Sequence, residues 1–391
     1  MFETVFTCAP GELIHCFAAT NGYIFLITSS LANTYEAKLC YANYERNKSL
    51  TRSNYPLHIS RTSLKCEETD FVVRSIQIVS VPLVRKNVPL ETKFHLVINT
   101  GDGIQVCSLE EIIANRPTGK INKWSHGNVH DSIQCSYSQG YKDGSIMTTY
   151  STISGTFLCI KFDVASGCFQ VLPSSNQITV CQDTIMDRVN SIAGLRNTAI
   201  NYPRPSDEKL WTTLSNREAM VFSSFDNNFY SIIDGKLEIQ SYYNIGEDAA
   251  NNTLTWADFA IVKQYTTSSL RFFVANISNV GCLLYKRSNR GNWDLVKVLR
   301  RETGGLEKTS LVDCLIQLDS SHPNRFFVFS GSENGKLYRW EYDYKDDSIV
   351  DSNTYDTENT GLIHSISVVG SKKVFFLSND NKSIKYLQLY Y

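Results

Sequence analysis

The sequence has no long apolar segment and no excess of charge of either sign. A membrane-spanning helix needs about 18 or more consecutive apolar residues, and no stretch of this chain approaches that length. Lys and Arg number 38 and Asp and Glu number 39, which leaves a formal net charge of -1. We therefore expect no membrane span, no polybasic surface for nucleic acid and no acidic tail.

The start of the chain lacks the features of a secretory signal. Glu3 stands where such a signal carries positive charge, and Pro10, Gly11 and Glu12 interrupt the apolar residues. The sequence therefore predicts an intracellular protein, nuclear or cytoplasmic, that is not secreted.

The cysteines are not arranged for metal binding or for a disulfide framework. The chain has 11 cysteines, an odd number, and none are spaced as CxxC. The nearest pair is Cys8 and Cys16, whereas zinc sites and redox motifs need tighter pairs. Cys40 and Cys159 lie in apolar runs. We interpret most cysteines as small buried hydrophobic residues in a reducing compartment.

Motifs of common enzyme classes are missing as well. The sequence has no P-loop, no GxGxxG opening a helix after a strand, and no GxSxG. His126 and His130 have the spacing of helical metal ligands, but their context predicts a surface loop. We therefore expect no enzyme: no catalytic residue, no metal, no cofactor and no small-molecule substrate.

One pattern recurs along the whole chain. A short run of bulky apolar residues ends in Ser, Thr or Asn, a polar or glycine-containing turn follows, and a second run alternates apolar and polar residues. Alternation with a period of two residues is typical of a strand with one buried face, so each copy predicts a β-hairpin. Seven copies align on the residue that closes the first run: Thr28, Asn99, Thr148, Ser223, Asn276, Ser330 and Ser378. Their spacing fits the roughly 40–50 residues of one four-stranded blade, with two longer intervals.

Further strands are expected beside these hairpins. Segments 293–299 and 168–174 are expected to add a fourth strand, and the turns Asp102-Gly103 and Asn334-Gly335 are expected to use the positive φ of glycine. Innermost strands are predicted where small or β-branched residues precede a hairpin, at 75–81, 131–138, 255–262, 311–318 and 362–369.

Together these repeats resemble the WD40-repeat family of β-propellers. Trp340-Glu341 stands at the place of the Trp-Asp dipeptide, with Glu for Asp. The position favours a bulky apolar side chain between blades, and the other units carry there Ser108, Ile160, Ile232, Tyr285 and Leu387. The Gly-His motif of the family is absent, so its His–Asp–Ser/Thr–Trp hydrogen-bond network is expected to be missing.

The resemblance implies an all-β fold: a single seven-bladed propeller over residues 1–391. The chain ends in a strand at 383–391, and the first residues are expected to supply the outer strand of that last blade, which would close the ring. Two polar insertions are predicted, near 43–70 and 182–218, the second with a short helix after Ser206. Another short helix is expected at 109–114.

The densest basic stretch is residues 286–301, which interleaves arginines with a tryptophan. Such a stretch can be a solvated outer hairpin, a protein interface or a grip for phosphates and bases. As partner-binding candidates we select Arg290, Trp293, Arg300 and Arg301.

The resemblance implies a non-catalytic scaffold or adaptor subunit that binds other protein subunits of a larger complex, for example one of nuclear-pore type. Near-neutral charge argues against nucleic acid as the partner. Two alternatives stay open. The first is a propeller hydrolase that uses central-channel residues such as Asp313 and His364. The second is a phosphate- or nucleic-acid-binding propeller that uses the stretch 286–301.

Overall fold

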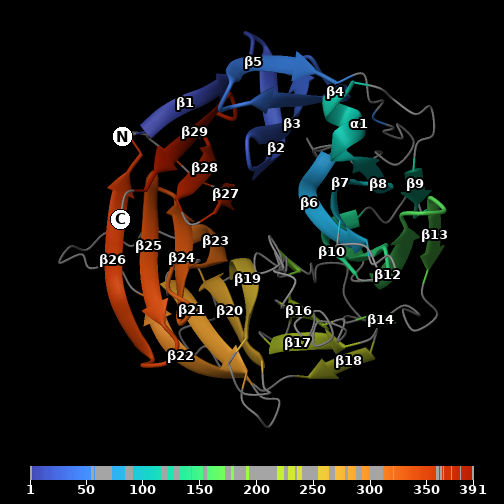
Figure 1. Cartoon of the computed structure of the whole chain (residues 1–391). Helices are drawn as coiled ribbons and strands as arrows, with labels where there is room; N and C mark the ends of the chain where they lie inside the picture. The colour runs from blue at the N-terminus through green and yellow to red at the C-terminus, as the bar shows by residue number, and fades with distance from the viewer. Residues whose placement is uncertain are drawn as a thin grey trace. The chain divides into compact units, whose positions relative to one another are not determined.

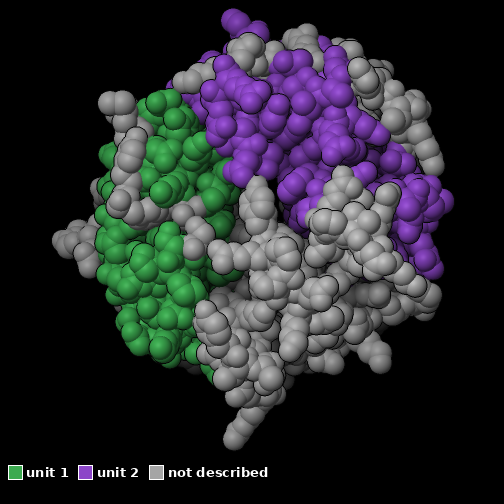
Figure 2. All heavy atoms as spheres, in the orientation of Figure 1, with its two compact units in different colours: residues 1–3, 187–380, 385–391 green, residues 4–186, 381–384 purple. Residues whose placement is uncertain are grey.

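The computed structural model describes a large part of the chain, in two compact units. Unit 1 comprises Met1–Glu3, Asp187–Asp380 and Lys385–Tyr391, and unit 2 comprises Thr4–Met186 and Asn381–Ile384 (Figure 2). The described residues are 2–53, 57, 73–83, 91–115, 122–126, 133–141, 143–152, 156–171, 178–179, 191–192, 218–223, 228–233, 236–239, 254–263, 269–277, 281–287, 293–299, 311–319, 321–357, 361, 363, 365–370, 372–378 and 380–389. The prediction of a single domain stays a prediction.

Within these residues the fold is almost entirely β, in seven antiparallel sheets (Figure 1). Three sheets lie in unit 2. The first contains β2 (Glu12–Thr20), β3 (Tyr23–Ser30), β4 (Asn33–Asn43) and β5 (Asn47–Arg52). The second contains β6 (Val73–Leu83), β7 (Glu91–Thr100), β8 (Gly103–Ser108) and β9 (Asn122–Ser125). The third contains β10 (Ile133–Gly140), β11 (Ser145–Thr152), β12 (Thr156–Asp163), β13 (Cys168–Val171) and the short β14 (Ile178–Thr179).

Three further sheets lie in unit 1. The fourth contains β15 (Ser191–Ile192), β16 (Glu218–Ser223), β17 (Asn228–Ile233) and β18 (Lys236–Ile239). The fifth contains β19 (Leu254–Lys263), β20 (Ser269–Ile277), β21 (Gly281–Arg287) and β22 (Trp293–Leu299). The sixth contains β23 (Leu311–Leu318), β24 (Arg325–Ser332), β25 (Lys336–Asp343) and β26 (Ser348–Asp356). In each of these six sheets four strands lie side by side in chain order, which is the up-and-down arrangement of a propeller blade, and the short β14 pairs with β12 outside that order.

The seventh sheet joins the two ends of the chain. Its order is β1 (Phe2–Thr7), β29 (Ser383–Gln388), β28 (Lys373–Leu377) and β27 (Ile366–Val369). The N-terminal strand is therefore the outer strand of the last sheet, as the sequence predicts. Beside it, Cys8 N–H donates to the carbonyl of Lys382 at 2.7 Å.

The first strand of each sheet lies against the first strand of the next within each unit. In unit 2, β2 contacts β6 and β6 contacts β10; in unit 1, β15 contacts β19, β19 contacts β23 and β23 contacts β27. The five segments predicted as innermost strands coincide with β6, β10, β19, β23 and β27, each at one end of its sheet. The strands themselves are confirmed, as is the fourth strand at 293–299, and their innermost place stays a prediction.

Apolar side chains on facing sheets form the cores. Val274 and Leu284 of one sheet pack with Ile316 and Trp340 of the next, and Phe327 and Phe329 in turn pack against the last sheet. In unit 2, Ile27 and Leu39 pack against Leu96 and Ile98 in the same manner. Each such side chain contributes about 1.5–3 kcal/mol through burial, so stacking of neighbouring sheets stabilises the fold.

The bulky position of the repeat is confirmed as a core position. Ile160, Tyr285, Trp340 and Leu387 are all at most 3% exposed. Ser108 departs from the pattern: it is half-buried and precedes the short helix α1 (Leu109–Ile113), which matches the helix predicted at 109–114. Ile232 lies in β17, and its side chain is outside the described part.

The polar residue that closes the first run of each repeat is buried rather than solvated. Six of the seven have described side chains, and all six are at most 5% exposed: Thr28, Asn99, Thr148, Asn276, Ser330 and Ser378. At three of these positions a side-chain hydrogen bond compensates for the burial: the hydroxyls of Ser138 and Thr148 lie 2.8 Å apart, and Asn276 Nδ2 donates to Ser330 Oγ at 2.9 Å. The second of these bonds links adjacent sheets.

One of the two turn predictions is wrong. Gly335 has a φ of 75°, as expected for the Asn334-Gly335 turn, but Gly103 is not among the positive-φ glycines. The reason for glycine at 103 is a close approach of β9: a Cβ there would lie 2.0 Å from the carbonyl oxygen of Trp124.

The two predicted insertions fall largely outside the described residues. In the first, 47–52 form β5, the outer strand paired with β4, and residues 54–56 and 58–70 are not described. In the second, only Ser191–Ile192 and Glu218 are described, so the helix predicted after Ser206 is untested. Among the described residues, no helix has the length and apolar character needed to cross a membrane.

The described cysteines carry free thiols and fit the interpretation from sequence. The thiols of Cys8, Cys40, Cys107, Cys282 and Cys314 are buried, that of Cys16 is half-buried and that of Cys168 is exposed. Burial raises the pKa of the Cys16 thiol, which keeps it protonated and unreactive.

Candidate functional site

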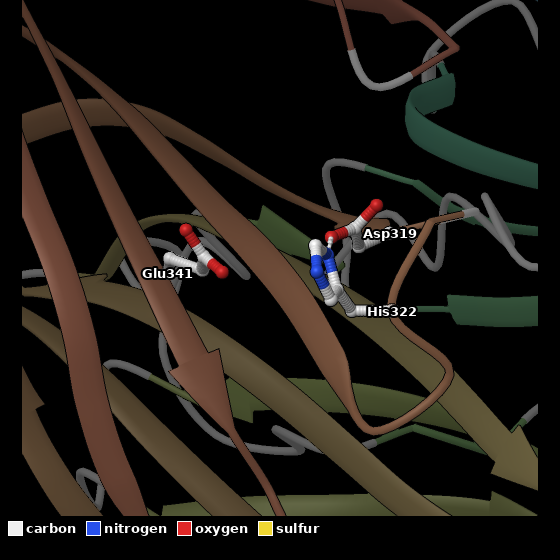
Figure 3. Close-up of side chains that lie close together, drawn as sticks. All are labelled: Asp319, His322 and Glu341. Atoms are coloured by element: carbon white, nitrogen blue, oxygen red, sulfur yellow. Dashed lines mark hydrogen bonds and ion pairs between the residues drawn. The ribbon is translucent and has the colours of Figure 1, made fainter. Parts of the chain in front are cut away.

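Three potential metal ligands meet at one end of the sheet β23–β26. Asp319 and His322 come from the turn between β23 and β24, and Glu341 comes from β25 (Figure 3). One ligand atom from each lies within 4.8 Å of the other two. Asp319 and Glu341 are buried, at 8% and 9% exposed, whereas His322 is exposed.

The turn places the first two of these side chains. Asp319 Oδ1 accepts a hydrogen bond of 2.8 Å from the N–H of Ser321, which is the local bond that makes aspartate common in turns. Arg325 N–H donates to the carbonyl of His322 at 3.0 Å and closes the turn. His322 Nδ1 then lies 2.8 Å from Asp319 Oδ2.

Arg325 binds the carboxylates of the adjacent strand. In the β24–β25 ladder Arg325 lies opposite Asp343, and Phe327 lies opposite Glu341, so one guanidinium reaches both acids. Its Nη1 is 2.8 Å from Glu341 Oε1, and its Nε is 3.4 Å from Asp343 Oδ2. The hydrogen bonds that Arg325 donates to Glu341 and, secondarily, to Asp343 raise the pKa of Arg325, so this cation is permanent.

The cluster can in principle hold a divalent cation, because carboxylate oxygen and imidazole nitrogen are ordinary ligands. As it stands, each group already has a partner: Glu341 pairs with Arg325, and Asp319 accepts from Ser321 and contacts His322. A metal ion would have to displace the guanidinium. For hydrolysis, a nucleophile would have to lie within reach of His322, and its described side-chain bond goes to Asp319 alone. The arrangement is therefore a network of hydrogen bonds and ion pairs that compensates for buried acids.

Sequence reasoning missed this cluster. Its signals are an Asp-x-x-His sequence in a turn and the Glu that replaces Asp after Trp340. These signals are weak, because local spacing accounts only for Asp319 and His322, and the pairing of β24 with β25 brings Glu341 to them.

The basic stretch 286–301 is described only in part. Arg290, Arg300 and Arg301 lie outside the described residues, and of Trp293 only the backbone, at the start of β22, is described. The described residues therefore do not test whether these four side chains lie together. Their role in partner binding stays a prediction.

Lys286, in the same stretch, already has two contacts. Its Nζ lies 3.6 Å from Asp347 and 5.9 Å from the centre of the Phe272 ring. This pairing weakens the electrostatic case for phosphate binding at this lysine.

Residues of the first strands are also engaged in structural contacts. Gln77 Oε1 accepts from the N–H of Ser138 at 2.8 Å, and its Nε2 donates to the carbonyl of Ser136 at 3.5 Å, so Gln77 joins β6 to β10. The side chain of Asp313, and the whole of His364 and His130, lie outside the described residues.

Comparison with known proteins agrees with this architecture. No family model and no curated protein matches the chain. The crystal structure of BBS1N in complex with ARL6DN is similar over 99% of this chain and 98% of that chain, at 12% identity and a TM-score of 0.51. The crystal structure of RRP9 WD40 repeats covers 100% of both chains, at 9% identity and a TM-score of 0.52.

The fold is that of a divergent WD40-like β-propeller. Chaetomium thermophilum Raptor is similar too, over 99% of this chain and 29% of that chain, at 8% identity and a TM-score of 0.53. At these identities the likeness establishes the propeller fold and leaves function to the site.

Proposed function

We propose that this propeller is a non-catalytic docking subunit of a multiprotein complex. The observation that carries the proposal is the likeness, over nearly the whole chain, to a propeller crystallised with a protein partner, BBS1N with ARL6DN. The state of the charged cluster adds support, since His322 is already hydrogen-bonded to Asp319 and Glu341 is already paired with Arg325. The stacked sheets within each unit offer loops and outer strands as binding surfaces.

A finer proposal concerns the cellular compartment of the complex and the residues that contact the partner. We expect an intracellular complex, nuclear or cytoplasmic, with a nuclear-pore-type assembly as one example. Arg and Trp are the residue types most often found as interface anchors, which supports Arg290, Trp293, Arg300 and Arg301 as contact residues.

The test is affinity purification of the tagged full-length chain under native conditions, with low-salt and high-salt washes and mass spectrometry of the retained proteins. A stoichiometric protein that survives high salt supports a docking subunit, because screened surface charges alone would release it. A chain recovered alone contradicts the proposal. A phosphate or nucleic-acid function would instead give nucleic acid or lipid that high salt removes.

A pair of variants tests the contact residues. Arg300→Ala with Arg301→Ala should reduce recovery of the partner several-fold if these arginines anchor it. The matched control is Lys345→Ala with Lys372→Ala, which removes the same charge at two exposed positions in unit 1. Equal recovery with both variants would contradict the assignment of the arginines and leave the docking function standing.

A further inference from the structure

β26 differs from the other outer strands in length. It is last in the order β23-β24-β25-β26, and no described strand pairs with its outward edge (Figure 1). It has nine residues, whereas the other outer strands in the described sheets have between four and seven. An unpaired edge offers a row of backbone donors and acceptors to another extended chain.

The register shows which backbone groups point outward. Thr357 N–H donates inward to the carbonyl of Gly335 at 3.1 Å. In an antiparallel ladder the direction of the backbone groups alternates from residue to residue. The N–H and C=O groups of Ser352, Thr354 and Asp356 therefore point away from β25, and all three residues are exposed.

Side-chain contacts hold this edge in place. Tyr342 donates its hydroxyl to Asp347 Oδ1 at 2.7 Å, just before the strand begins. Within the strand, Asp351 pairs with Arg339, and Tyr355 packs against the core that the last sheet shares. The strand is therefore fixed on its inner side, so a partner would add to a preformed template with little ordering cost in β26.

The charged side chains of β26 and of the two residues before it are all acidic. Residues 346–356 contain Asp346, Asp347, Asp351 and Asp356 and no Lys or Arg. Asp347 and Asp351 contact Lys286 and Arg339, yet their side chains remain 57% and 45% exposed. Many proteins protect an open edge with lysine or proline, and β26 has neither.

The first residues of β26, before its regularly paired part 351–356, present apolar side chains. Asp351 lies opposite Glu341 and Ile349 opposite Tyr342, so Val350 is the extra residue of a bulge. Ile349 and Val350 are 40% and 45% exposed. The bulge disrupts pairing at Val350 and leaves 351–356 as the straight edge.

We propose that β26 binds an extended, basic segment of a partner protein as an added strand along residues 351–356. Backbone hydrogen bonds supply the pairing, lysines or arginines of the segment face the aspartates, and an apolar residue contacts Ile349 and Val350. A second copy of this chain is disfavoured as occupant, because two β26 edges would bring their aspartates together. The inference rests on the proposed docking function and names its surface.

The test uses the full-length chain and a labelled peptide of alternating lysine and valine, equal in length to β26. Fluorescence anisotropy should show binding that weakens with salt, and hydrogen exchange should slow at Ser352, Thr354 and Asp356. The same peptide with every backbone nitrogen methylated should bind at least about tenfold more weakly, because neither of its edges can then donate a backbone hydrogen bond. Equal affinity for both peptides, no binding of the unmodified peptide, or protection confined to other strands would overturn the proposal.

A matched pair of variants separates backbone pairing from charge. Thr354→Pro removes one outward N–H, and Thr354→Ala keeps it at the same exposed position. Thr354→Pro should weaken peptide binding about tenfold and Thr354→Ala by less than about twofold, with unfolding midpoints measured for both. If both variants bind like the parent chain, β26 is not the surface.

The native partner distinguishes this inference from the docking function. A stoichiometric partner retained equally by parent chain and Thr354→Pro would refute the role of β26 and leave docking intact. Absence of any stoichiometric partner would refute the docking function itself.

Discussion

The buried side-chain amide of Asn99 gives a prediction about the free energy of unfolding that tests the role of this repeat position. Asn99 and Asn276 occupy the same repeat position in two sheets, and both are at most 1% exposed. Neither Oδ1 nor Nδ2 of Asn99 has a hydrogen-bond partner among the residues that the structure describes. Asn276 Nδ2, in contrast, donates to Ser330 Oγ at 2.9 Å. The same substitution should therefore have opposite effects at the two positions.

Asn99→Leu should stabilise the protein. Asn99 shares its face of β7 with Val97, which packs in the core toward the third sheet, so an apolar side chain of similar volume suits the site. A buried polar group without a partner costs about 1–3 kcal/mol. Removal of that cost should raise the free energy of unfolding by about 1–2 kcal/mol after allowance for repacking.

Asn276→Leu should destabilise the protein by about 1–2 kcal/mol, because it removes the bond to Ser330 and buries leucine against that hydroxyl. Urea unfolding of both variants and the parent chain, followed by tryptophan fluorescence, measures the two changes. A loss of stability at Asn99→Leu equal to that at Asn276→Leu would refute the reasoning, since it would show that the Asn99 amide is satisfied.

Three further perturbations have defined outcomes. Burial, and secondarily Lys93, lowers the pKa of His95 from 6.5 to about 4, so folding disfavours the protonated form of His95. The contribution of His95 to the free energy of unfolding should therefore be complete above pH 6.5 and should be lost as the pH falls from 6.5 toward 4. Urea titrations at each pH should show a smaller loss of stability in His95→Gln than in the parent chain. Arg325→Gln should lower the unfolding temperature, because Arg325 pairs with Glu341. The double variant Arg325→Gln with Glu341→Gln should lower the unfolding temperature by less than the sum of the two single changes, because the two residues contact each other. Differential scanning fluorimetry measures all three changes. Gly103→Ala should cost about 1–3 kcal/mol in urea unfolding, because its Cβ would lie 2.0 Å from the Trp124 carbonyl oxygen.

The sheets were predictable from sequence because their signals are local. Alternation with period two marks the strands, and a glycine such as Gly335 marks the turn between them. The bulky position of the repeat was predictable for Tyr285 and Trp340 because side chains of one strand face must enter a core. Gly103 was misread, because its constraint comes from β9, some twenty residues further along the chain.

The candidate site was less predictable for the same physical reason. Glu341 meets Asp319 and His322 only through the pairing of β24 with β25, and no spacing in the sequence reveals that pairing. The open edge of β26 likewise depends on its place as the last strand of its sheet. Composition alone could show that the segment is acidic, but not that its backbone faces outward.

The central claim is that this propeller works by binding other proteins, and its most direct test is the size of the untagged chain in fresh native extract. Size-exclusion chromatography with detection by a specific antibody should place the chain far above the elution volume of the purified monomer, in both low and high salt. Elution of the whole pool at the monomer position in both conditions would contradict the claim.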